Sequence, residues 1–128
     1  MRTTLTFSLA CACALAGCGG SGSGGGGKSV TVPGGKPIAV TATEYKFDPG
    51  TITVTGGGGN VRFELKNAGS QAHDLHVLKG GDDVGGTSVF GPDQTQGATV
   101  KLQPGTYEFV CTVGNHADLG MKGKLVVK

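Results

Sequence analysis

The sequence has no concentration of charge of either sign and almost no long apolar stretch. Its 128 residues include 11 Lys and Arg against 9 Asp and Glu, which gives a formal net charge of +2. No basic stripe indicates nucleic-acid binding, and no acidic block indicates a solvated tail. Beyond residue 16, no apolar run approaches the roughly 20 residues that a membrane-spanning helix needs. The length suits one folded domain, and we expect no nucleic-acid partner.

The one apolar run stands near the N-terminus, at residues 5–16. It is rich in Ala and Leu, follows a positively charged start and is too short to cross a bilayer. The run ends in Leu-Ala-Gly-Cys at residues 15–18, which resembles a bacterial lipoprotein signal. The resemblance implies a signal peptide over residues 1–17 and lipidation of Cys18. It also implies an extracytoplasmic protein that is lipid-anchored to a membrane of the bacterial cell envelope.

Cysteine is scarce in the remainder of the chain. The lipidated Cys and the Gly/Ser-rich segment after it occupy residues 18–27, and such composition predicts a flexible tether. The predicted domain, residues 28–128, then contains Cys111 as its only thiol. One thiol cannot form an intramolecular disulfide, so the domain is not a disulfide scaffold. An unpaired Cys in an oxidising compartment is open to oxidation, from which a bound metal would protect it.

No segment of the domain shows a sustained helical period. Short alternating runs rich in Val, Thr, Ile and Phe are separated by Gly, Pro, Asn and Asp, a pattern typical of an antiparallel all-β sandwich or barrel. Residues 80–97 have no strong pattern and predict a long surface excursion, with a brief helix or strand around Thr87–Phe90. We predict about eight strands, near Ser29–Val32, Ile38–Tyr45, Thr51–Thr55, Val61–Lys66, Asp74–Leu78, Ala98–Leu102, Tyr107–Thr112 and Lys124–Lys128.

Strand alternation aligns two reactive side chains with the expected core. Side chains alternate between the two faces of a strand, so Phe109 and Cys111 share one face. Leu75 and Val77 share a face in the same way, and His73 joins them if that strand extends back to it. Cys111 and His73 therefore lie in line with core residues, each at one end of its strand.

The segment between the last two strands contains three candidates at equal spacing, of which Cys111 is the first. Cys111, His116 and Met121 are five residues apart. Five steps along a helix rotate by about 140° relative to the start, and an odd spacing on a strand places neighbours on opposite faces. Only a loop brings the three side chains together, and glycines within the segment supply the necessary backbone freedom. His73 could provide a fourth group.

These four groups together select a metal. Two imidazoles and a thiolate, with a thioether as a weak axial partner, suit copper that cycles between Cu(I) and Cu(II). Zinc has no use for a Met and usually takes water or another Cys or His. Each residue alone is more often a packing or surface residue, but the ordered set on an all-β pattern indicates one bound copper ion.

The domain resembles the cupredoxins, the small blue-copper proteins, over essentially all of residues 28–128. The resemblance begins with Tyr-Lys-Phe-Asp-Pro-Gly at residues 45–50 and continues through residues 67–74. It ends with the Cys, His and Met of residues 111–121 and the Lys-Gly that follows. The loop spacing is most similar to the rusticyanin and sulfocyanin members. The resemblance implies a Greek-key antiparallel β-sandwich of the cupredoxin-like kind that holds a type 1 copper.

The resemblance also implies a role for each residue. His73 and His116 would bind the copper through their imidazoles and Cys111 through its thiolate. Met121 would be the axial thioether ligand. The backbone carbonyl of Ala72 would approach the copper. Asp74 would hydrogen-bond toward Thr112 and so join the two segments that carry ligands. Many cupredoxins have Pro-Gly before the loop His, where this chain has Gly114-Asn115; Asn tolerates a left-handed backbone, so we expect the turn to persist in a looser metal-free loop.

The function that this set predicts is single-electron transfer between redox proteins. A cytochrome, oxidase or reductase would dock near His116, whose flanking residues could form a small apolar patch. We expect a monomer that is tethered to the membrane. The residues of this predicted patch are Val113, Gly114, Ala117, Leu119 and Gly120.

Two other functions are less consistent with the composition. A copper chaperone or scavenger on the same fold would display exposed Met and His clusters, yet the chain has two Met and three His. Multicopper oxidases need His on both sides of the Cys, where this chain has Val110 and Thr112. We therefore expect no enzymatic activity. The third His, His76, is three residues from His73 and on the opposite strand face, so we predict a surface residue.

Overall fold

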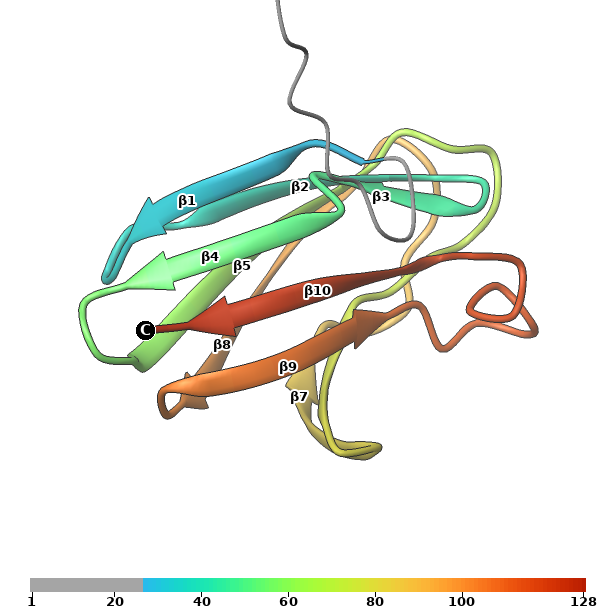
Figure 1. The fold of residues 1–128 in the computed structure, drawn as a ribbon. Coiled ribbons are helices and arrows are strands. Elements are labelled where there is room, and N and C mark those ends of the chain that lie inside the picture. Colours follow the sequence, from blue (N-terminus) through green and yellow to red (C-terminus); the bar gives the residue numbers. More distant parts are fainter. Residues whose placement is uncertain (1–26) are drawn as a thin grey trace, which may run out of the picture.

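The computed structural model describes residues 27–128, which form ten strands and no helix (Figure 1). The predicted signal peptide and Cys18 lie outside the described residues. No part of the described chain forms a helix of the length and apolarity needed to cross a membrane. The strands are β1 (Ser29–Pro33), β2 (Ile38–Thr43), β3 (Lys46–Asp48), β4 (Thr51–Thr55), β5 (Gly59–Asn67), β6 (His76–Lys79), β7 (Asp82–Gly86), β8 (Thr95–Leu102), β9 (Gly105–Val110) and β10 (Lys122–Val127).

The strands form two sheets. One sheet has six strands in the order β1-β4-β10-β9-β6-β7, and the other has four in the order β3-β2-β5-β8. Three pairs are parallel, namely β1 with β4, β4 with β10, and β2 with β5, while the remaining pairs are antiparallel. The prediction of an all-β, cupredoxin-like sandwich is confirmed. The sheets are mixed rather than wholly antiparallel, and the described residues contain ten strands rather than about eight.

The core lies between the sheets and follows the period-two alternation of the strands. On β5, Val61, Phe63 and Leu65 are buried while the residues between them are partly or fully exposed. Phe47 of β3 packs against Phe109 of β9, with ring centroids 5.3 Å apart, and so joins the two sheets. Each such buried side chain stabilises the fold by about 1.5–3 kcal/mol relative to exposure. This core holds β9 and β10 in fixed positions beneath the loop that joins them.

Residues 80–97 are more ordered than the surface excursion that we predicted. Asp82–Gly86 forms β7, which pairs with β6, and β8 already begins at Thr95. Between them, Phe90 is only 5% exposed and forms an isolated antiparallel bridge with His73. Gly pairs weaken the strand pattern of this segment, but pairing with an existing sheet edge overrides weak local propensity.

Candidate metal centre

The candidate centre lies at one end of the sandwich, where the loop between β9 and β10 projects (right-hand side of Figure 1). Cys111 directly follows β9, and Met121 directly precedes β10. The Cys111 N–H donates to the Met121 carbonyl at 3.1 Å, and the Met121 N–H donates to the His116 carbonyl at 3.0 Å. The two strands thus close the loop at its base, and a backbone bond fixes His116 above it. The left-handed residue of the turn is Gly114, with φ 48°, rather than Asn115.

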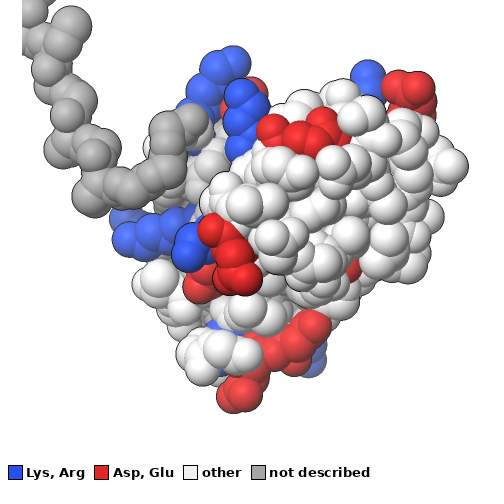
Figure 2. Space-filling model, turned by 90° about the vertical axis from the view of Figure 1, so that its right-hand side faces the viewer, with Lys and Arg blue, Asp and Glu red and all other residues white. Residues whose placement is uncertain are grey.

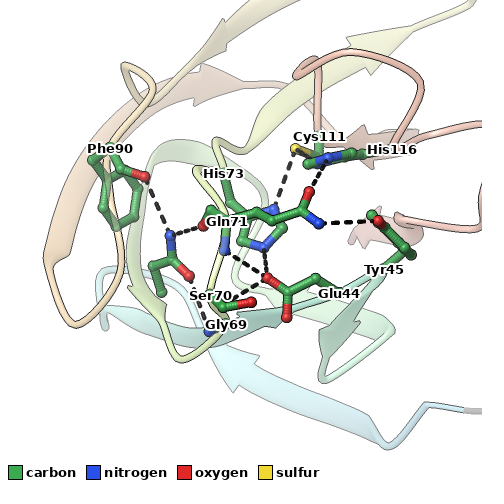
Figure 3. A network of polar contacts seen from close by, with 10 residues as sticks. Glu44, Tyr45, Gly69, Ser70, Gln71, His73, Phe90, Cys111 and His116 are labelled. Carbon is green, nitrogen blue, oxygen red and sulfur yellow. Dashed lines mark hydrogen bonds and ion pairs between the residues drawn. The ribbon is translucent and has the colours of Figure 1, made fainter.

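Three of the predicted ligands converge on one buried point (Figure 3). Cys111 Sγ lies 3.6 Å from His116 Nδ1 and 3.9 Å from His73 Nδ1. The three donor atoms lie within 4.8 Å of one another. The side chains come from segments that are 38 and 5 residues apart in the chain, and all three are buried. Met121, the fourth predicted ligand, is fully buried at the base of the same loop.

His73 is held in place by backbone pairing and by a buried amide. Its N–H donates to the Phe90 carbonyl at 3.1 Å, and the Phe90 N–H donates back at 3.0 Å. Asn67 is fully buried, and its Nδ2 donates to the carbonyls of Gln71, at 2.8 Å, and Phe90, at 3.2 Å. Its Oδ1 accepts the Gly69 N–H at 3.0 Å. Asn67 therefore shapes the loop before His73 from inside.

Both imidazoles have their second nitrogen occupied by a side-chain oxygen. His73 Nε2 lies 3.3 Å from Glu44 Oε1, and His116 Nε2 lies 3.0 Å from Gln71 Oε1. A carboxylate or amide oxygen only accepts hydrogen bonds, so each Nε2 carries the proton. Each Nδ1 then presents its lone pair to the side where Cys111 lies. This is the arrangement that metal-binding His usually shows, with the outer nitrogen fixing the tautomer.

The outer face of His116 is covered. Gln71 also donates from Nε2 to the Tyr45 hydroxyl at 3.1 Å, and the Tyr45 and His116 rings lie 5.0 Å apart. His116 is consequently only 6% exposed. Gln71 and Tyr45 therefore separate most of the His116 ring from solvent, and only a small part of its edge is exposed.

The expected contact between Asp74 and Thr112 is present. Asp74 is 1% exposed; its Oδ1 accepts the Thr112 N–H at 2.6 Å, and its Oδ2 accepts the Thr112 hydroxyl. Ala72 lies immediately before His73 and is half-buried, and the approach of its carbonyl to a metal stays a prediction. His76 is partly exposed, and its Nδ1 lies 2.6 Å from Asp83 Oδ2.

Two ionisable groups at the centre have altered pKa values. Burial raises the pKa of the Cys111 thiol above its usual value. The Gln71 N–H, followed by the N–H groups of Glu44 itself and of Ser70 and then by His73, lowers the pKa of Glu44 to about 2, against the opposing effect of desolvation. Burial disfavours the thiolate form of Cys111, and a bound cation would stabilise that form.

The donor chemistry fits copper. A thiolate sulfur and two imidazole nitrogens, buried together next to a buried Met, form a soft set that suits Cu(I) and Cu(II) better than Mg²⁺ or Ca²⁺. Among the described residues this is the one cluster of three or more His, Cys, Asp or Glu side chains that could hold a metal ion.

No sequence pattern indicated a role for Glu44 or Gln71. Their partners, His73 and His116, are 29 and 45 residues away in the chain, and no periodicity links such distant positions. The one available signal was that Glu44 is an acidic residue at the end of an apolar alternating strand, directly before the Tyr45 motif.

Comparison with known proteins gives the family. The family model described as a cupredoxin-like domain matches residues 23–127, and the chain belongs to this family. Among solved structures, reduced auracyanin from the photosynthetic bacterium Roseiflexus castenholzii is 25% identical, with a TM-score of 0.66 over 72% of this chain and 96% of that one. Reduced rusticyanin is also 25% identical, with a TM-score of 0.61 over 78% of this chain and 84% of that one. Auracyanin A of Chloroflexus aurantiacus, a "blue" copper protein, shares the fold at 23% identity, with a TM-score of 0.63 over 73% of this chain and 100% of that one.

A curated relative points to another context. The iron uptake system component EfeO of Escherichia coli (strain K12) is 34% identical over 91 residues, which is 71% of this chain. The chain spans only 23% of the length of that relative. The likeness therefore concerns one part of a larger protein.

Proposed function

We propose that this chain is a type 1 copper protein that carries single electrons and catalyses no reaction of its own. The observation that supports this most strongly is the buried convergence of Cys111, His73 and His116 in a cupredoxin-like sandwich. Copper bound there would supply one-electron exchange between Cu(I) and Cu(II). His73 and His116 would hold it through Nδ1 and Cys111 through its thiolate, with Met121 as the axial ligand.

The chain's own contribution is rigidity. A site that moves little when the charge of its ion changes passes electrons quickly, and each ligand segment here is fixed by several contacts. The bridge to Phe90 fixes His73, the base of the β9–β10 loop fixes Cys111, and Asp74 joins the two segments through Thr112. These restraints come from contacts between the protein's own segments.

We propose that redox partners dock on the end of the sandwich that carries His116. That end shows a broad surface without charged side chains (Figure 2). Leu119 is 50% exposed in the loop, with Gly114 and Gly120 exposed beside it and Val113 half-buried. Redox proteins use small, short-lived interfaces, which an uncharged surface of this kind suits. A cytochrome, oxidase or reductase would meet Gln71 and Tyr45 together with His116, and the carrier would act as a monomer.

The N-terminal sequence supports an extracytoplasmic location for this carrier. Lipidation of Cys18 and a Gly/Ser-rich tether up to residue 27 would keep the domain close to a membrane of the bacterial envelope. A carrier held in this way would serve partners at that membrane.

Reductive titration of the copper-loaded protein tests the proposal. Cu(II) bound to the Cys111 thiolate should give an intense visible band that bleaches on anaerobic reduction and returns on oxidation. His116→Gln should lose or greatly weaken the band. His76→Gln is the matched control, because His76 is not one of the three clustered side chains and contacts the carboxylates of Asp83 and Asp74 rather than a predicted ligand, and it should keep the band. A colourless Cu(II) form of the unmodified protein would contradict the proposal.

A metal-acquisition role is the second candidate, because the EfeO likeness covers 71% of the chain at 34% identity. It includes the alternative of a copper chaperone or scavenger on the same fold. Such a protein would release its ion readily to a chelator or prefer iron, and it would exchange electrons slowly. Competition between Fe(III) and Cu(II), followed by transfer to a chelator of moderate affinity, separates the two functions.

A further inference from the structure

Glu44 follows β2 directly, and three donors converge on one of its oxygens. Its Oε1 accepts the N–H groups of Ser70, at 2.7 Å, and Gln71, at 2.8 Å, and it lies 3.3 Å from His73 Nε2 (Figure 3). A Cβ at Gly69 would collide with this carboxylate, so the absence of a side chain there leaves room for it. The carboxylate therefore occupies a fitted position between the β2–β3 turn and the loop that leads to His73.

We propose that Glu44 is a positioning residue that fixes the tautomer of His73 and lowers the reduction potential of the metal centre. This inference rests on the proposed function, because it concerns the same copper site. The Glu44 carboxylate is an acceptor only, so its contact requires a proton on His73 Nε2. The Nδ1 lone pair is then directed to the side of Cys111, as ligation demands.

The negative charge has a second effect. A carboxylate that is hydrogen-bonded to a ligand makes the imidazole more electron-donating and stabilises the more highly charged ion more than the less charged one. Among residues 27–128, the ion pairs include none between Glu44 and a Lys or Arg. Its charge is therefore not neutralised by a neighbouring cation. The Ser70 and Gln71 N–H groups and His73, which surround its Oε1, favour the ionised carboxylate.

The two imidazoles differ in this respect. His73 is fully buried and contacts an anionic oxygen, whereas His116 lies near the surface and contacts the neutral amide of Gln71. Of the two predicted His ligands, the fully buried His73 thus contacts a charged carboxylate, whereas His116 contacts a neutral amide. We expect the tuning of the centre to come from Glu44 and the contact with partners to come from the side of Gln71.

Glu44→Gln tests the charge while keeping an oxygen for the Ser70 and Gln71 N–H groups. We expect the relative affinity for Cu(I) over Cu(II) to rise about tenfold, which raises a one-electron potential by about 59 mV. Glu44→Asp keeps the charge and should restore a potential closer to that of the unmodified protein. Glu64→Gln is the matched control, because Glu64 is a partly exposed carboxylate on β5 that pairs with Arg62 at 3.3 Å, and it should leave the potential unchanged.

Nitrogen NMR of the metal-free protein provides a readout that needs no copper. We expect His73 to hold its proton on Nε2 in the unmodified protein and to show a mixture of tautomers in Glu44→Ala. A Glu44→Gln potential no different from the Glu64→Gln control, or a His73 tautomer unchanged in Glu44→Ala, would overturn the inference while the blue copper site itself stands. Failure of the unmodified protein to bind copper would overturn the proposed function instead, and the tautomer measurement would still decide the positioning role.

Discussion

The contact between Asp74 and Thr112 offers a quantitative test of how the two ligand segments are joined. Asp74 is 1% exposed and accepts both the N–H and the hydroxyl of Thr112, which directly follows Cys111. Replacing Asp74 by Ala removes both bonds, whereas Asp74→Asn keeps the shape and can form two neutral bonds. The three forms therefore separate the effect of charge from that of the contact.

The magnitude follows from the character of these bonds. Hydrogen bonds to a charged group contribute about 1.5–3 kcal/mol each, and the lower value applies because Thr112 faces solvent. We expect Asp74→Ala to lower the free energy of unfolding of the metal-free protein by about 3 kcal/mol. Neutral bonds are about half as strong, so Asp74→Asn should lose roughly half as much. For a domain of this size, a loss of about 3 kcal/mol lowers Tm by roughly 12 °C or more.

Urea unfolding of the metal-free protein measures these differences. Thr112→Val removes the hydroxyl bond alone and should cost about 1.5 kcal/mol, and the double variant with Asp74→Ala should cost little more than Asp74→Ala by itself. Simple additivity of the two substitutions would contradict a direct bond between them. Equal stability of Asp74→Ala and Asp74→Asn would refute the role assigned to the two oxygens.

Three further predictions concern the groups around the centre. The Glu44 pKa falls to about 2 in the folded state, so the stabilising effect of Glu44 should be fully present above about pH 4.5 and lost as the pH falls through 2. The free energies of unfolding of Glu44→Gln and of the unmodified metal-free protein should therefore become equal near pH 2. Because the Cys111 thiol is buried and its pKa is raised, iodoacetamide at pH 8 should label it slowly in the folded metal-free protein and quickly in urea, and rapid labelling of the folded form would contradict this. Gln71→Ala uncovers His116 Nε2, so electron self-exchange measured by NMR line broadening should become faster, and an unchanged or slower rate would show that Gln71 does not limit access.

All four predicted ligand residues were identified from the sequence, for physical reasons that are mostly local. Cys111 and His116 belong to one short loop, and their spacing does not suit a helix or a strand, so the convergence of these two side chains follows from local sequence. Leu75 and Val77 are fully buried as expected, but β6 begins at His76 and does not extend back to His73, which pairs with Phe90 in an isolated bridge instead. Strand periodicity likewise predicted the all-β sandwich and most of its strands.

The remainder depends on contacts that only the folded chain creates. Glu44 reaches His73 across 29 residues, and Gln71 reaches His116 across 45, because the β2–β3 turn and two loops meet at one end of the sandwich. The strand β7 was missed because its Gly-rich sequence has low β propensity and forms a strand through its pairing with β6. The same limit applies to the parallel pairs, since alternation shows which residues face the core and not which strands are neighbours.

The visible and EPR spectra of the copper-loaded protein, recorded side by side with those of Cys111→Ser, test the central claim most directly. We expect an intense thiolate-to-copper band and the small copper hyperfine splitting of a type 1 site in the unmodified protein. Both features should vanish in the variant, which keeps the size of the side chain but loses the sulfur. Persistence of the blue band in Cys111→Ser, or a colourless Cu(II) form of the unmodified protein, would contradict the account.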